Sequence, residues 1–98
     1  MKRYRITYVS FVNGNNGEEW KESSSGTMGT YNTLEEMFKV MDAEIEHYKA
    51  YYDNVEIKNS YEECVITYTS QLFKTSRQEV KIYKLLEFDL DKYTKGSR

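Results

Sequence analysis

A single segment of this chain has the spacing of a helix, and alternating segments lie on both sides of it. Between residues 33 and 52 apolar side chains recur at intervals of three and four, which places them on one stripe of a helix. Thr33 followed by Glu36 is typical of a helix start, because the threonine oxygen accepts a backbone N–H and the glutamate reaches back. The stripe comprises Leu34, Met37, Phe38, Met41, Ile45 and Tyr48. We expect the helix to end near residues 52–54.

The remaining segments alternate between polar and apolar residues, which is the period of a strand. We expect strands over residues 3–12, 18–25, 54–59, 62–73 and 78–88. Residues 13–17 and 74–77 predict turns, and residues 25–30 predict a flexible linker before the helix. The order of two strands, one helix and three strands predicts an α+β fold, in which the helix packs on one face of an antiparallel sheet.

The alternation also predicts which side chains of the strands face the core. They are Tyr4, Ile6, Tyr8, Ser10 and Val12 in the first strand, Cys64, Ile66 and Tyr68 in the fourth, and Val80, Ile82, Leu86 and Phe88 in the last, with Lys84 as a violation. The first strand is also apolar at Val9 and Phe11 on its other side, which favours an interior position in the sheet. The second strand is polar, and this predicts an edge strand.

Length and composition place the chain among small globular domains. Its 98 residues are 39% hydrophobic and 31% charged, a balance that supports one modest core. We expect a single domain over residues 1–88 and a mobile charged tail over residues 89–98. No apolar run approaches the ~18 residues of a membrane span. The first residues lack the apolar stretch of a leader peptide, so we expect none. Cys64 is the only cysteine, so an internal disulfide is excluded and a cytoplasmic location is favoured.

The charges are distributed unevenly along the chain. The net charge is −2, but residues 33–63 carry nine acidic and three basic groups. The segments before and after them are net basic. Such polarity can steer and orient a partner, and it can equally hold the two halves of the sheet together.

No catalytic, metal-binding or nucleotide-binding motif is present. Cys64 with His47 would make a thiol–imidazole pair, but Cys64 alternates with expected core residues, where cysteine is usually inert. Glu44 with His47 has the Glu-x-x-His spacing of metal-binding bundles, which needs further ligands on other helices. Residues 25–30 lack the lysine of a P-loop. We therefore expect no enzyme, no metal and no cofactor.

Aromatic residues suggest a protein contact surface. Ten tyrosines bring the aromatic fraction to 15%, and tyrosine suits both half-buried sheets and interfaces. Tyr51 and Tyr52 cannot both join the core stripe of the helix, so we expect at least one to be exposed. The expected contact residues are Trp20, Tyr51 and Tyr52 as aromatic anchors, with Asp42, Glu46 and Asp53 directing them to a basic surface of another protein.

Two other functions remain open from the sequence. Arg3, Arg5, Lys81, Tyr83 and Lys84 lie on the first and last strands and would bind nucleic acid if Tyr83 and Arg5 shared an outward face. The isoelectric point of about 5.5 speaks against this function, because such proteins are normally basic. The third function is a self-assembling subunit, a homodimer in the simplest case, in which the sheet edge or open face pairs with a second copy.

In size, composition and absence of motifs, the chain resembles the small accessory proteins of phages and mobile elements. It contains no proline and is rich in lysine, asparagine and tyrosine, residues that an AT-rich genome encodes easily. These accessory proteins include anti-CRISPR inhibitors of host defence nucleases. The resemblance covers no particular residues. It implies a small non-enzymatic modulator that binds a host or phage protein.

Overall fold

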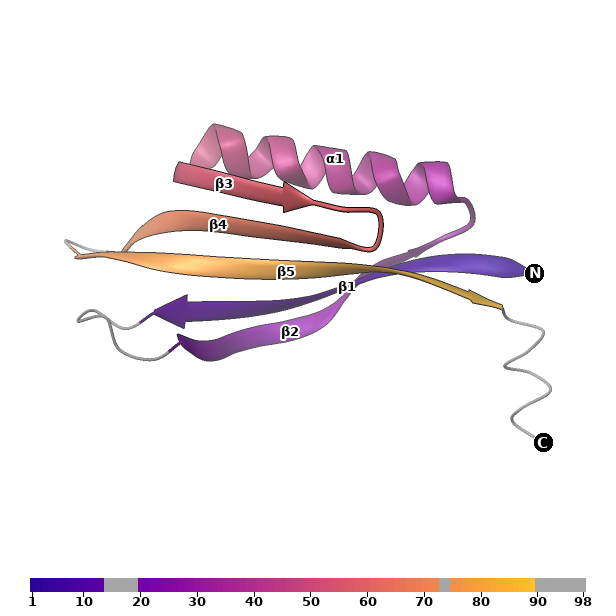
Figure 1. Cartoon of the computed structure of the whole chain (residues 1–98), viewed down its shortest axis with the longest axis horizontal. Coiled ribbons are helices and arrows are strands. Elements are labelled where there is room, and N and C mark those ends of the chain that lie inside the picture. The colour runs from indigo at the N-terminus through magenta and orange to yellow at the C-terminus, as the bar shows by residue number, and fades with distance from the viewer. Residues whose placement is uncertain (14–19, 73–74, 90–98) are drawn as a thin grey trace.

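The computed structural model describes residues 1–13, 20–72 and 75–89, which form one sheet and one helix (Figure 1). In chain order the elements are β1 (Lys2–Asn13), β2 (Trp20–Tyr31), α1 (Leu34–Tyr51), β3 (Asp53–Asn59), β4 (Glu63–Leu72) and β5 (Thr75–Asp89). The predicted α+β class and order of elements are confirmed. The domain over 1–88 with a tail over 89–98 stays a prediction. β5 extends to Asp89, and residues 90–98 lie outside the described residues.

The five strands are antiparallel to their neighbours and lie in the order β2-β1-β5-β4-β3. The last strand is therefore central, and it pairs with the first strand on one side and with β4 on the other, as Figure 1 shows. β2 and β3 form the two edges. This order confirms the interior position predicted for β1 and the edge position predicted for β2.

The helix begins at the predicted residue. The Thr33 hydroxyl accepts the N–H of Glu36 at 3.1 Å. The Glu36 carboxylate accepts the N–H of Asn32 at 3.4 Å, one residue earlier than a capping box requires. At the other end the N–H of Tyr52 donates to the Tyr48 carbonyl at 3.0 Å, and the helix stops at Tyr51, as predicted.

One core lies between the helix and one face of the sheet. Its buried side chains are Ile6, Met37, Met41, Ile45, Tyr48, Cys64, Ile66, Tyr68, Tyr83 and Leu85. The predicted inward faces of α1, β1 and β4 are represented in this set. Leu34 and Phe38 are half-buried and pack against it.

The inward face predicted for β5 is wrong. Tyr83 and Leu85 are buried, whereas Val80, Ile82, Leu86 and Phe88 alternate with them and point to the opposite face. Pairing sets this orientation, because Tyr83 lies opposite Cys64 and Leu85 lies opposite Ile6. Directly paired residues project from the same face of a sheet. Since β5 is apolar on both faces, its alternation alone could not indicate which face the helix covers.

The predicted linker at residues 25–30 is also wrong, because these residues continue β2 along β1 as far as the Tyr4–Tyr31 pair. Small residues let this edge strand lie against large rings. A Cβ at Gly26 would lie 3.2 Å from the Tyr8 hydroxyl oxygen, and one at Gly29 would collide with the Tyr31 ring. A stretch that looks flexible in sequence is thus a strand adapted to two tyrosines.

The first predicted turn falls largely outside the described residues, whereas most of the second is described. Asn13 is the last residue of β1, and residues 14–17 are not described. Residues 75–77 belong to β5, so the turn predicted over 74–77 is wrong for those three residues.

Candidate interaction surface

The two faces of the sheet differ in what covers them. α1 lies along one side of the sheet (Figure 1) and packs on the face that carries Tyr83 and Leu85. Among the described residues no element lies on the other face, which we call the open face. An antiparallel sheet with one solvated face normally carries polar residues on that face. The composition of the open face is therefore informative.

The centre of the open face is apolar. Apart from Trp20 at the edge, which pairs with Asn13, its apolar side chains are Val9 and Phe11 on β1, Val65 on β4, and Val80, Ile82, Leu86 and Phe88 on β5. Two adjacent cross-strand rows are apolar: Val9 pairs with Ile82 and Ile82 with Val65, and Phe11 pairs with Val80. Neighbouring side chains half-bury most of them, whereas Leu86 is 43% exposed. We name these seven residues the apolar stripe.

Sequence reasoning missed this surface because it assigned four of its residues to the core. A signal was present in the sequence. Between Glu79 and Phe88 the open side of β5 carries four large apolar residues, whereas the covered side carries only Tyr83 and Leu85. An interior strand that is apolar on both sides is typical of a sheet covered on both faces.

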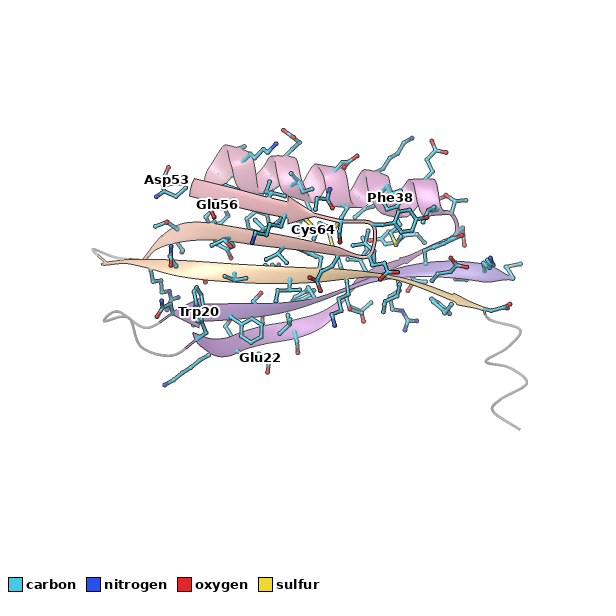
Figure 2. The ribbon with its side chains drawn as sticks, viewed as in Figure 1. Trp20, Glu22, Phe38, Asp53, Glu56 and Cys64 are labelled. Carbon is cyan, nitrogen blue, oxygen red and sulfur yellow. The ribbon has the colours of Figure 1, made fainter. Side chains whose placement is uncertain are left out.

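Charged residues of opposite sign lie at the two ends of the stripe. At one end, Arg3 pairs with Phe88 and Arg5 with Leu86. Lys84 lies nearer the middle, between Leu86 and Ile82 on β5, where it interrupts the apolar stripe. At the other end, one cross-strand row runs from Glu22 through Phe11 and Val80 to Glu56. Figure 2 shows Glu22 and Glu56 at the same end of the molecule, on opposite edges. We call Arg3 and Arg5 the basic end, and Glu22 and Glu56 the acidic end.

Only some of the charged groups at the basic end have interaction partners within the described residues. The Arg5 guanidinium lies 4.7 Å from the centre of the Phe88 ring, and its Nε donates to the Thr30 hydroxyl at 3.4 Å. The Nε atom of Arg3 is buried and lacks a hydrogen-bond partner among the described residues. Within residues 1–13, 20–72 and 75–89, no ion pair involves either end. These charges are available to a partner.

The residues expected to contact a protein do not form one patch. Tyr51 is 74% exposed, beside the ring of His47 at 4.7 Å, and Asp42 and Glu46 are exposed on α1. Trp20 is 43% exposed but lies on β2, the edge opposite β3. Figure 2 shows the separation between Trp20 and Asp53, which is the exposed first residue of β3.

Tyr52 is half-buried and packs against the core. Its ring centre lies 5.2 Å from that of Tyr48 and 4.5 Å from that of Tyr68. The two adjacent tyrosines thus have different surroundings: Tyr51 projects to solvent, whereas Tyr52 stacks on core rings.

The residues expected to bind nucleic acid are divided between the two faces. Arg3, Arg5 and Lys84 lie on the open face, whereas Tyr83 is on the covered face with 0% exposure. The expectation that Tyr83 and Arg5 share an outward face is therefore wrong. Lys81 also lies on the covered side, and its ammonium is 4.6 Å from the centre of the Tyr8 ring.

Tyr83 belongs to a hydrogen-bonded group inside the molecule. Its hydroxyl donates to a Glu44 carboxylate oxygen at 2.6 Å and lies 3.4 Å from the Tyr48 hydroxyl. Burial, followed by the bond to Glu44, raises the pKa of Tyr83 far above its usual range, and burial also raises the pKa of Tyr68. Much of the tyrosine content of the chain therefore serves the core.

Other features offer little chemistry. Cys64 is fully buried, and burial raises the pKa of its thiol, which disfavours the thiolate that a nucleophile needs. His47 is exposed on α1.

A hollow of about 730 Å³ lies between the start of α1, the β3–β4 turn and β5, and its lining includes Glu62, Glu87 and Lys84. No cluster of metal-ligating side chains occurs among the described residues.

Among those same residues, no helix combines the length and apolar character needed to cross a membrane. Comparisons of the chain with known protein families, with curated proteins and with solved structures found no match. The functional argument therefore rests on the surfaces of the molecule.

Proposed function

We propose that this protein is a non-enzymatic binding domain that recognises another polypeptide through the open face of its sheet. The observation that supports the proposal is the apolar stripe at the centre of an uncovered face. Contiguous apolar surface on a folded domain is typical of an interaction site. An apolar centre with charged residues around it is also the usual organisation of a protein interface.

The charges suggest how such a partner would be oriented. The basic and acidic ends of the open face would set the orientation of the partner at contact. A small protein that occupies a partner's surface in this way can act as a modulator. Inhibition of a host nuclease in the cytoplasm would be one such role.

Nucleic-acid binding is the weaker alternative. The basic end and Lys84 offer three cations, but apolar side chains occupy much of the middle of the same face, where a phosphate backbone would need further charges. The aromatic ring expected to stack on bases, that of Tyr83, is inside the core. A protein partner fits this surface better.

The test is an affinity capture from lysate of the native host with nuclease present, read by mass spectrometry. We expect wild-type protein and Tyr51→Glu, an equally charged change on the exterior of α1, to retain a stoichiometric polypeptide, and Ile82→Glu to lose it. Loss of the captured material on adding nuclease would shift the function to nucleic acid. Loss with Tyr51→Glu but not with Ile82→Glu would move the site to the end of the helix.

A further inference from the structure

We infer that the polypeptide that covers the open face is a second copy of this chain, packed face to face as a two-fold symmetric sandwich. This inference rests on the proposed function and names the partner of the same surface. The outer layers of the assembly would be two α1 helices, and the two sheets would enclose a second core between them. Three properties of the open face support this occupant.

The first property is size. Five strands spaced ~4.8 Å apart, with about six outward residues along the central strand, present roughly 800 Å² of surface. A stable protein interface buries about 800 Å² on each partner. The open face alone therefore suffices for a dimer, without any contribution from the edges or from α1.

The second property is the position of apolar residues towards both ends of the strands. Val9, Ile82 and Val65 form one row with Phe11 and Val80 beside it, and the row of Thr7, Lys84 and Glu63 separates these residues from Leu86 and Phe88. A two-fold axis that lies in the plane of the sheet and perpendicular to the strands exchanges these ends. With this axis between the rows of Ile82 and Lys84, Leu86 of one copy would lie over Val80 of the other, as in aligned sheet packing. The alkyl part of Lys84 would lie over Ile82 of the other copy.

The third property is charge. The same axis places the basic end of each copy over the acidic end of its partner, so Arg5 of one copy comes near Glu22 of the other. The buried Nε of Arg3, which has no partner among the described residues, lies at this end. Pairing places three other charged residues on this face: Lys58 and Glu63 lie between the ends, and Asp53 lies beyond Glu56 at the acidic end. The two ends of the face are thus complementary to each other, as an isologous interface requires.

The test measures the mass of the protein in solution by sedimentation velocity, from low micromolar to near millimolar concentration. We expect wild-type protein and Tyr51→Glu to form dimers, and Ile82→Glu to remain monomeric with a folded circular dichroism spectrum. A wild-type monomer at every concentration would overturn the inference, and so would a dimer that Ile82→Glu leaves intact.

A charge exchange tests the two-fold geometry with exposed residues, so the result does not depend on whether Ile82→Glu folds. Arg5→Glu and Glu22→Arg should each weaken dimerisation about tenfold or more, and the two changes in one chain should restore it. Absence of rescue would overturn the proposed arrangement. A monomeric wild-type chain that still captures another protein through Ile82 would leave the proposed function standing while this inference fails.

Discussion

Along β5, the covered and open faces of the sheet both carry apolar residues, but these residues have different neighbours. Along β5, Leu85 is 7% exposed beneath α1, whereas the adjacent Leu86 is 43% exposed on the open face. Both are leucines in one central strand, so propensity and position in the chain are equal. What separates them is the presence of the helix. Apolar residues in a strand therefore indicate that a face is suited to burial, but they do not indicate what covers that face.

The largest expected effect contrasts these two leucines. Leu85→Ala should lower the free energy of unfolding of the monomer by about 2–5 kcal/mol, because it removes a buried side chain from a packed core. Leu86→Ala should lower it by less than about 1 kcal/mol, since 43% of its surface already contacts water. Urea unfolding at low protein concentration measures both. Equal losses would show that the open face is as well packed as the covered one within a single chain.

The second contrast between the two faces is their response to alkaline pH. The covered face contains buried tyrosines that can lose a proton, whereas no described tyrosine lies on the open face. Folding raises the pKa of Tyr83 and of Tyr68 through burial, so the folded state holds protons that the unfolded state releases above about pH 10. Their stabilising contribution is therefore complete below pH 10 and is lost as pH rises further. The expected slope is about 1.4 kcal/mol per pH unit for each tyrosine.

Urea unfolding between pH 8 and pH 11 measures this slope. Tyr83→Phe combined with Tyr68→Phe should flatten it, although the loss of the bond to Glu44 should lower stability at every pH. Tyr61→Phe, at a 69% exposed tyrosine, is the matched control and should leave the slope unchanged. An unchanged slope in the double variant would mean that these two hydroxyls are not the source of the alkaline sensitivity.

The smallest expected effect concerns the helix that distinguishes the two faces. Thr33→Ala removes the side-chain acceptor for the Glu36 N–H and should cost about 1 kcal/mol of stability, whereas Thr33→Ser should cost little. Thermal unfolding of the monomer measures both variants. A destabilisation by Thr33→Ser as large as that by Thr33→Ala would indicate that the methyl group, and not the hydroxyl, stabilises the start of α1.

Local sequence patterns were sufficient for much of the fold. The three-and-four spacing and the Thr33 cap predicted α1, and the polar composition of residues 18–25 predicted an edge strand. The linker predicted at residues 25–30 shows the limit of local composition. Gly26 accommodates the ring of Tyr8 on the neighbouring strand, and only the pairing of β2 with β1 reveals that requirement.

The candidate site was less predictable than the fold. The helical period predicted that at least one of Tyr51 and Tyr52 is exposed, because both cannot join the core stripe with Tyr48, but it did not decide which one. The burial of Tyr52 does not follow from this period, since its contact with Tyr68 joins residues far apart in sequence. The separation of Trp20 from Tyr51 depends on strand order, which no local pattern encodes.

The sequence by itself determined the order of the elements, the extent of the helix and its buried stripe, because these depend on interactions between near neighbours. Only the tertiary structure decided that β5 lies between β1 and β4, that Tyr83 is buried, and that Ile82 and Leu86 are on the uncovered side. The physical reason is that pairing between distant strands sets which alternating residues share a face. When both sets are apolar, their alternation is the same whichever set the helix covers.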